Sequence, residues 1–211
     1  MEMIKGLPMP DGLKKSDIME LLLREEYGFL PPAPDSVSAE SESHDHGFCA
    51  GKADLERLRL TCDAPFGRFS FPVSLICPTG KKGPAPCFIH INFRDAVPDE
   101  YLPAEELVDN GYAVLYFCYS DVTSDDGNFQ DGLAGLIYPE GRTSGSQCGK
   151  IGLWAWAVSR VMDYALTLPQ LDPSRISVVG HSRLGKTALL AGALDERFYC
   201  AFSNDSGCSG A

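Results

Sequence analysis

One short stretch of the chain, residues 176–187, has the residue types and the spacing that acyl-transfer chemistry needs. Its apolar run, glycines and following alanine-rich segment predict a strand, a tight turn and a helix. A serine on such a turn projects its hydroxyl from the carboxyl edge of a sheet, where N–H groups at the helix N-terminus stabilise a developing oxyanion. Ser182 takes this nucleophile position, two residues after Gly180. The usual pattern G-x-S-x-G is not met, because Leu184 stands where the second glycine belongs and Gly185 comes one residue later.

The same residues also satisfy a second motif, the phosphate-binding loop. Residues 180–187 match G-x-x-x-x-G-K-[ST] letter for letter. In such a loop backbone amides cradle phosphates, Lys186 would supply charge, and Thr187 would offer a hydroxyl to magnesium. A third interpretation is purely structural, with Ser182 serving only as a cap of the helix that follows. The surroundings of the motif must decide among the three.

The composition is that of a globular protein and limits the classes of partner. With 211 residues, 44% of them hydrophobic and 22% charged, the chain is one domain with a real core, or one domain cut short. The net charge of −11 argues against nucleic acid as the main partner. No apolar segment approaches the length of a membrane span, so we expect no membrane partner. Residues 1–6 open no apolar core of a signal peptide, so we expect a cytoplasmic protein, or one already stripped of its leader.

The chain has eight cysteines and four histidines, but the spacing of these residues favours neither a disulfide framework nor a metal site. No two cysteines form a C-x-x-C pair, and several lie in apolar runs, which predicts reduced and mostly buried thiols. His44 and His46 form a His-x-His pair near Cys49, but nothing else in the sequence completes a ligand set. We therefore expect a solvated loop there and no metal site. His90 lies inside an apolar strand and is expected to be a core histidine.

The order of the predicted elements indicates an α/β protein. An amphipathic helix over residues 15–27 is followed by a polar, acidic connection to about residue 50. Two alternating segments, 57–62 and 69–78, predict an antiparallel hairpin, and Pro72 favours an edge position for it. From residue 85 the predicted order is strand, helix, strand, helix, strand, helix and strand, over residues 85–93, 103–110, 112–119, 151–168, 176–181, 187–194 and 198–203. This alternation predicts a mostly parallel sheet with flanking helices.

At this point the chain resembles a known family: the glucuronoyl esterases and their bacterial relatives, often labelled acetyl xylan esterase-like, within the α/β-hydrolase superfamily. Their elbow reads G-x-S-R-x-G-K, as residues 180–186 do here, so the family shares the departure from G-x-S-x-G. The likeness continues through residues 191–197 and 205–207, and upstream through residues 154–164. The resemblance implies an α/β-hydrolase fold and hydrolysis of carbohydrate esters. Residues 51–211 would then be the N-terminal part of such a domain, incomplete after the strand that follows the elbow, with residues 1–50 before it.

The resemblance also implies roles for individual residues. Ser182 would be the nucleophile, and Arg183 would help to hold the oxyanion through its backbone N–H and its guanidinium. Lys186 would contact the sugar acid of the substrate. Asp205 stands where some members of the family carry the triad acid, whereas others carry it later in the chain. The alternative for Asp205 is a polar residue that caps a strand end. The ester chemistry needs no metal or cofactor, and none is indicated.

A general base for Ser182 is missing from the sequence. In α/β hydrolases the chain order is serine, acid and histidine, and none of the four histidines follows Ser182. His181 is adjacent to Ser182, but neighbours on a tight turn point apart. The strand over residues 198–203 would also be left as a bare apolar edge, which promotes association. We therefore expect a fragment of a longer enzyme, or a chain completed by a second polypeptide or by self-association over this strand.

The order of the elements also weighs on the three interpretations of the motif. A phosphate-binding loop usually opens its domain and is followed by a strand that ends in a magnesium-binding aspartate, whereas only 24 residues follow Thr187. A hairpin and two further strands before the motif are what an α/β hydrolase places before its nucleophile. We therefore predict a serine carboxylic-ester hydrolase that acts through an acyl-enzyme at Ser182. Nucleotide binding by residues 180–187, or a catalytically inactive hydrolase-like module, remain the alternatives.

Overall fold

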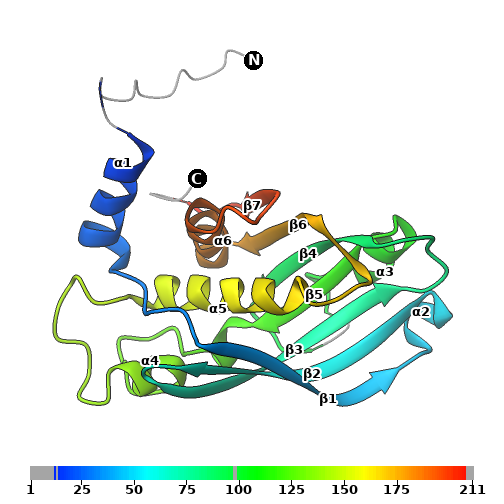
Figure 1. Cartoon of the computed structure of the whole chain (residues 1–211), viewed down its shortest axis with the longest axis horizontal. Coiled ribbons are helices and arrows are strands. Elements are labelled where there is room, and N and C mark those ends of the chain that lie inside the picture. Colours follow the sequence, from blue (N-terminus) through cyan, green and yellow to red (C-terminus); the bar gives the residue numbers. More distant parts are fainter. Residues whose placement is uncertain (1–11, 13, 97–98, 208–211) are drawn as a thin grey trace.

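A computed structural model describes residue 12 and residues 14–96 and 99–207 of the chain. Its centre is one seven-stranded sheet with the order β1-β2-β3-β5-β4-β6-β7 (Figure 1). Residues 1–6, on which the expectation about a signal peptide rests, lie outside the described residues. None of the described helices combines the length and the apolarity that crossing a bilayer requires.

Three antiparallel strands form one side of the sheet: β1 (Ser36–Asp45), β2 (Ala53–Ala64) and β3 (Gly67–Pro78). The predicted hairpin is β2 and β3, which pair along their full length from Ala53↔Pro78 to Ala64↔Gly67. Every second residue in the middle of β2 is buried, as its alternating sequence requires for a strand with one face on the core. The hairpin prediction is therefore confirmed.

The prediction of a polar loop before this hairpin is wrong. Most of the segment forms β1, which pairs with β2 from Ser36↔Asp63 to Asp45↔Leu55. Its serines and glutamates are all exposed, and only Val37 and Ala39 pack against the core. The polar composition concealed the strand because an edge strand can be held largely by backbone hydrogen bonds to its neighbour. β1, not the hairpin, is thus the edge on this side of the sheet. Pro72 is tolerated inside β3 because the β3–β5 ladder covers only Ser74–Ile76 and leaves the Pro72 position without a partner on that side.

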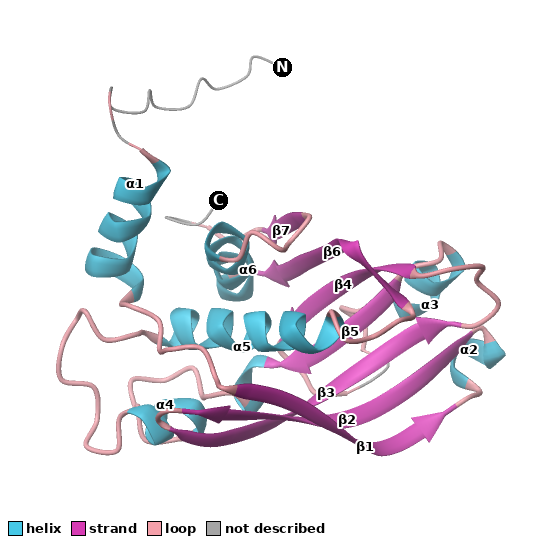
Figure 2. Ribbon diagram, in the orientation of Figure 1, coloured by secondary structure: helices cyan, strands magenta, loops and turns pink. Residues whose placement is uncertain are grey.

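Four parallel strands form the other side: β5 (Ala113–Cys118), β4 (Ala85–Asn92), β6 (Leu171–His181) and β7 (Cys200–Asn204). β5 is buried on both faces, as expected for a parallel strand between helices, whereas β4 is buried on one face and half-buried along most of the other. Four of the seven strands run in parallel, the antiparallel strands precede them, and the helices lie between them in sequence (Figure 2). The α/β fold class predicted from the sequence is confirmed.

The helices cover the two faces of the sheet unequally. α5 (Lys150–Ala165) and α6 (Arg183–Leu194) share the main core with residues such as Leu115 and Phe117 of β5. α3 (Ala104–Asp109) packs on the opposite face against Val114 and Tyr116, which alternate with them. The positions of α3, α5 and α6 agree with the sequence prediction, to within a turn.

The connections contain more structure than the sequence predicts. The N-terminal helix is α1 (Lys15–Leu22) followed by a π-helical turn, η1 (Leu23–Tyr27). The connection between the predicted elements 112–119 and 151–168 includes η2 (Tyr119–Asp121) and α4 (Gly132–Ile137). A very short helix, α2 (Phe48–Gly51), joins β1 to β2. Of the cysteines in the described part of the chain, none is in a disulfide, and four of the seven are buried. This agrees with the expectation of reduced, mostly buried thiols.

Candidate active site

Ser182 is the single residue between β6 and α6, because the strand ends at His181 and the helix begins at Arg183. Its backbone has φ 55° and ψ −127°, a conformation that costs a non-glycine residue of order 1–3 kcal/mol and that is found mainly at functional sites. The turn is so tight that a Cβ atom on Gly180 would lie 2.2 Å from the carbonyl oxygen of Leu184. The chain thus keeps a strained serine at the carboxyl edge of the sheet, which is the geometry of a nucleophile elbow.

The second glycine of the motif has a packing role. A Cβ atom on Gly185 would lie 3.0 Å from Cβ of Ser206 and 3.2 Å from the carbonyl oxygen of Asn204. Gly185 therefore lets the first turn of α6 approach the end of β7 closely. Leu184, which occupies the usual glycine position, is fully buried in the main core. The shifted glycine explains why this elbow departs from G-x-S-x-G.

The interpretation of Ser182 as a helix cap is contradicted by its side chain. Ser182 occupies the N-cap position of α6 but makes no capping hydrogen bond through its hydroxyl. A serine retained only as a cap would use that oxygen to accept from the N–H of the second or third helical residue. Its backbone is engaged instead: the N–H donates to Asn204 O at 2.9 Å, and the carbonyl oxygen accepts from Gly185 N at 2.8 Å. The hydroxyl is left available for other chemistry.

The phosphate-loop interpretation is also wrong. A phosphate loop needs several residues between strand and helix so that their amides can surround an anion, and here only Ser182 separates β6 from α6. Thr187, which would have to face magnesium, is fully buried. Its hydroxyl donates to the Arg183 carbonyl oxygen at 3.1 Å. The sequence match arises because both architectures place glycines around a strand–helix junction.

Arg183 and the first turn of α6 supply the groups that can hold an oxyanion. The N–H groups of Arg183 and Leu184 are the first two of the helix, and α-helical geometry leaves them without intrahelical acceptors. The helix dipole adds positive potential at the same end. The guanidinium of Arg183 forms an ion pair with Asp125 and lies 5.6 Å above the centre of the Phe93 ring. These two contacts hold a half-exposed cation beside the elbow.

Lys186 lies one turn further along α6 and lines a cavity of about 300 Å³ together with Arg183. The other walls of this cavity include Glu26, Tyr27, Asp125 and Trp154. Its floor is braced by Lys150, a largely buried cation whose Nζ donates to Thr123 Oγ1 and to the carbonyl oxygen of Asn128 and pairs with Asp131. Three cations, Arg183, Lys186 and Lys150, thus line this cavity beside the elbow.

Asp205 follows β7 and stands at the same edge of the sheet as Ser182. The preceding residue, Asn204, accepts the hydrogen bond from the Ser182 N–H, so the two chain segments are tied at this point. Asp205 is exposed, with a positive φ of 49°, and the turn is closed by a 2.5 Å hydrogen bond between the hydroxyls of Ser203 and Ser206. The structure therefore brings Asp205 to the elbow, and its assignment as the triad acid stays a prediction.

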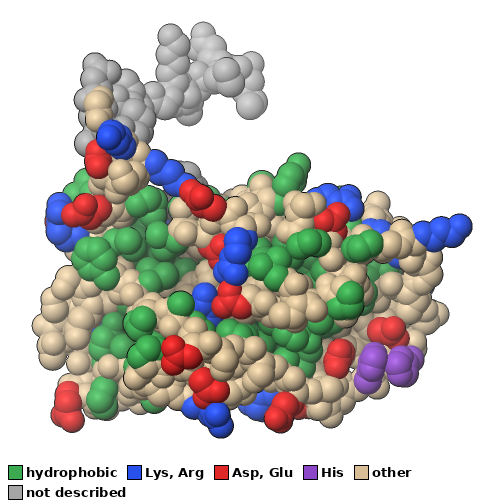
Figure 3. All heavy atoms as spheres, in the orientation of Figure 1, with side chains coloured by type: hydrophobic (Ala, Val, Ile, Leu, Met, Phe, Trp, Pro, Cys, Tyr) green, Lys and Arg blue, Asp and Glu red, His purple; other side chains and the backbone are tan. Residues whose placement is uncertain are grey.

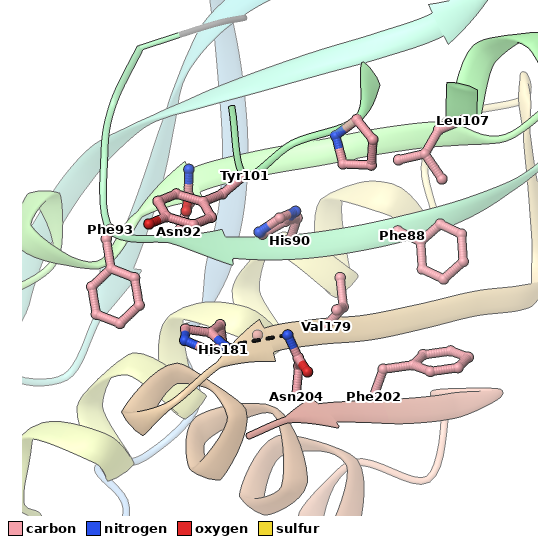
Figure 4. A pocket seen from close by; sticks show the side chains of 12 residues that line it. Phe88, His90, Asn92, Phe93, Tyr101, Leu107, Val179, His181, Phe202 and Asn204 are labelled. Atoms are coloured by element: carbon pink, nitrogen blue, oxygen red, sulfur yellow. Dashed lines mark hydrogen bonds between the residues drawn. The ribbon is translucent and has the colours of Figure 1, made fainter. Parts of the chain in front are cut away.

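None of the four histidines is hydrogen-bonded to Ser182 within the part of the chain that the structure describes. The ring of His181 turns away toward β7, where its Nδ1 lies 3.2 Å from Nδ2 of Asn204 (Figure 4). His44 and His46 belong to the far side of the sheet, at the end of β1. The structure thus gathers Ser182, Arg183, Lys186 and Asp205 at one edge without a general base.

His90 lines a second cavity, of about 520 Å³, on the face of the sheet that carries α3, and Gly180 and His181 of the elbow line it as well (Figure 4). Its ring contacts Tyr116 edge-on, with the ring centres 5.8 Å apart. Burial lowers the pKa of His90 to about 4, and nearby Asp99 offsets this only in part. Burial also raises the pKa of Tyr116 to about 12. His90 is therefore a neutral, largely buried histidine, in line with the sequence prediction, although it borders a cavity and not a filled core.

Sequence reasoning missed three residues that surround the elbow: Asp125 and Phe93, which hold Arg183, and Asn204, which binds the Ser182 N–H. Asp125 lies in the glycine- and acid-rich segment between β5 and α5. Long connections of this kind inside a compact domain usually carry function, and that was the available signal. No sequence pattern pointed to Phe93 or Asn204, since their roles come from the adjacency of β4, β6 and β7.

Comparison with known proteins gives consistent similarities. A family model described as "Glucuronyl esterase, fungi" matches residues 61–211. A 4-O-methyl-glucuronoyl methylesterase of Podospora anserina is 33% identical over 202 residues, which cover 93% of this chain and 37% of that protein. A carbohydrate esterase from an unknown prokaryotic organism is 39% identical over 109 residues, covering 51% of this chain and 25% of that protein.

The solved structures give the same result for the fold. A glucuronoyl esterase from Solibacter usitatus superimposes with a TM-score of 0.76 at 26% identity, covering 93% of this chain and 59% of that one. The chain therefore spans less than two thirds of the length of the relatives it matches. The resemblance drawn from the elbow motif is confirmed, and the nucleotide-binding and inactive-module alternatives have no support among these relatives.

Proposed function

Because the chain belongs to the glucuronyl esterase family, we propose that it carries the nucleophile of a serine carboxylic-ester hydrolase that acts on carbohydrate esters. One observation carries the proposal: Ser182 is held in a strained conformation at the β6–α6 junction, with its hydroxyl not used as a helix cap. Such strain persists only where the surrounding structure imposes it, and here it aims a hydroxyl at the open end of a helix.

The proposed reaction is a two-step acyl transfer. Oγ of Ser182 attacks the ester carbonyl carbon while a general base takes the hydroxyl proton, and the carbonyl oxygen becomes an oxyanion facing the N–H groups of Arg183 and Leu184. The tetrahedral intermediate then expels the alcohol, which receives that proton. Water attacks the acyl-enzyme by the same route and releases the acid and free Ser182. The guanidinium of Arg183, held by Asp125 and Phe93, adds a charge beside the oxyanion in both steps.

The acyl group that fits best is a uronic acid. In a glucuronoyl ester the sugar is on the acyl side of the scissile bond, whereas an acetyl ester carries only a methyl group there. The cavity of about 300 Å³ beside Arg183 and Lys186 is much larger than an acetyl group requires. Lys186 would bind the hydroxyl or acid oxygens of that sugar. The methyl ester of 4-O-methyl-glucuronate, the substrate in the name of the Podospora anserina relative, is therefore the first substrate to test.

The general base would come from a histidine outside these 211 residues, in a further segment or a second polypeptide. His181 is directed to Asn204, His90 lies in the other cavity, and His44 and His46 are on the far side of the sheet. The face of β7 with Phe202, 47% exposed, is one surface that such a segment or a second copy would cover. Asp205 would orient the incoming histidine, as the acid does in other triads.

Reaction with a fluorophosphonate tests the nucleophile directly. The probe loses fluoride to an activated serine and adds a fixed mass, so intact-mass measurement counts the labelled sites. We expect labelling of the longer polypeptide that includes this chain and the missing histidine, little labelling of the 211-residue chain alone, and none in Ser182→Ala. Ser38→Ala, which changes an exposed serine of β1, should label as the wild type does.

Two results would overturn the proposal. If the longer polypeptide hydrolyses the glucuronate ester but Ser182→Ala keeps the label, another serine is the nucleophile. If a folded longer polypeptide shows neither labelling nor hydrolysis, Ser182 is not an activated nucleophile and the esterase function is wrong.

A further inference from the structure

The end of β1 and the start of β2 bring three metal-binding side chains together. His44 lies near the end of β1, and His46 lies in the turn directly after Asp45, the last residue of that strand. In the antiparallel register His44 faces Glu56 and Asp45 faces Leu55, which places Asp54 across from His46. No sequence pattern pointed to this third ligand, because Asp54 comes close to the two histidines only through the turn that joins β1 to β2.

The three side chains are close enough to share one ion. Their ligand atoms all lie within 4.8 Å of one another. Nδ1 of His46 is 2.9 Å from Oδ1 of Asp54, and Nε2 of His44 is 3.9 Å from the same oxygen. Ligands about 2.0–2.2 Å from a tetrahedral ion lie roughly 3.3–3.6 Å apart, so small rotations of exposed side chains suffice. The imidazole rings of His44 and His46 are 4.0 Å apart between centres.

The backbone that carries these ligands is well fixed. Asp45 accepts from Gly47 N at 2.8 Å, and Gly51 N donates to Gly47 O at 3.0 Å. Thr79, just beyond β3, donates from its hydroxyl to Gly51 O and from its N–H to Lys52 O. These two hydrogen bonds tie the turn between β1 and β2 to the end of β3. Little backbone ordering is left for an ion to impose, which favours binding.

We propose that His44, His46 and Asp54 form a binding site for a divalent transition-metal ion of the zinc type. Two imidazoles and one carboxylate suit Zn²⁺, Ni²⁺ or Cu²⁺, whereas Mg²⁺ and Ca²⁺ prefer oxygen ligands. Figure 3 shows histidine and acidic side chains gathered at an exposed corner of the molecule, so the remaining coordination positions are open to water. The chain is also strongly acidic, with a net charge of −11, which favours cations in general.

The site lies away from the elbow. Four strands separate β1 from β6 in the sheet. The two strands also run in opposite directions, so the end of β1 with the cluster and the end of β6 with Ser182 lie at opposite ends of the sheet. The bound ion would clip the edge strand to β2 and so act on the stability of that edge. It would take no part in the hydrolysis proposed for Ser182.

Isothermal titration of the full chain with ZnCl₂ tests the site. The protein is first treated with N-ethylmaleimide, because Cys49 and Cys77 are partly exposed and Cys200 is exposed, and thiolates bind the same ion. We expect one ion per chain with micromolar affinity and a higher thermal midpoint in excess Zn²⁺. His46→Ala and Asp54→Asn should each weaken binding at least about ten-fold. Glu40→Ala, which removes an exposed acid from the same strand, should bind as the wild type does.

The outcomes separate cleanly because His46 is 76% exposed and its replacement should leave the fold intact, as circular dichroism would check. Equal binding by wild type, His46→Ala and Asp54→Asn would overturn the proposal and indicate ions held elsewhere. The same conclusion follows if the folded wild-type chain shows no heat of binding and no thermal shift at millimolar Zn²⁺. Loss of binding in both ligand variants but not in Glu40→Ala would support it.

Discussion

The parallel and antiparallel sides of the sheet position their polar groups by different means: the first by backbone conformation and close packing, the second by exposed side chains. On the parallel side the backbone positions Ser182: a strained turn, two glycines in close packing and a buried helix leave it no alternative. On the antiparallel side the His44, His46 and Asp54 cluster is assembled by side chains on an exposed edge strand. Changes at the first site should therefore alter reactivity and stability together, whereas changes at the second should alter ion binding, and stability only when the ion is present.

The largest expected difference is in hydrolysis of the glucuronate methyl ester by a polypeptide that includes this chain and its general base. Ser182→Ala removes the hydroxyl proposed to attack the ester, so kcat/KM should fall by about 10⁴-fold or more. The double change His44→Ala and His46→Ala should leave kcat/KM unchanged, because the cluster lies on the far side of the sheet. Steady-state rates at saturating and limiting ester check both. A comparable loss in the double variant would mean that the two sides are coupled.

The next largest effect concerns the stability of the elbow. Gly180→Ala would place a Cβ atom 2.2 Å from the backbone oxygen of Leu184, and neither group can move without opening the turn. We expect a loss of about 3 kcal/mol in the free energy of unfolding, measured with urea. Gly145→Ala is the matched control, since its Cβ would meet nothing within 4 Å, and its effect should stay below about 0.5 kcal/mol. Equal effects would show that the elbow is not tightly packed.

A third prediction concerns the pKa of His90, which differs between the folded and the unfolded chain. Its pKa is about 6.5 when exposed and about 4 in the folded protein, because burial disfavours the charged ring. As the pH falls from 6.5 toward 4, the unfolded state therefore binds a proton that the folded state does not, and stability is lost. The expected loss is up to about 3 kcal/mol at pH 4, relative to pH 7.

Urea unfolding of His90→Phe at both pH values isolates this contribution. The variant should lose less stability than the wild type on acidification, by the amount that His90 contributes. Val179→Ala, in the same cavity but without a titrating group, should keep the wild-type pH dependence. If His90→Phe and the wild type respond identically to pH, then His90 is not held neutral by burial.

The smallest effect is also the most specific to the elbow. Ser182→Gly should raise the free energy of unfolding by about 1 kcal/mol, because glycine adopts φ 55° without the strain of a side chain and this gain exceeds its extra entropy in the unfolded state. Ser38→Gly, in the extended strand β1, should instead be neutral or destabilising by up to about 1 kcal/mol. Denaturation midpoints decide the sign, and a destabilised Ser182→Gly variant would mean that the serine is not strained.

The amino-acid sequence by itself determined the parallel half of the fold and the identity of the elbow. The apolar runs that became β4, β5 and β6 and the long apolar face of α5 have few other ways to be buried. The local sequence alone identified Ser182, which lies between Gly180 and the start of a helix, and its neighbours Arg183 and Lys186. The absence of a histidine after Ser182 was equally plain from the order of residues.

Only the tertiary structure decided the polar arrangements. β1 carries only a short apolar pattern, Val37 and Ala39, and the rest of the strand is held by its backbone hydrogen bonds to β2. The same pairing turns His44 and His46 from two loop residues into neighbours of Asp54. Likewise, the ion pair between Arg183 and Asp125 forms only in the folded protein. The phosphate-loop interpretation is excluded only by the structure, in which a single residue, Ser182, separates β6 from α6. Burial of apolar residues is encoded locally along a chain, whereas contacts between polar groups far apart in sequence depend on strand register and on the packing that sets it.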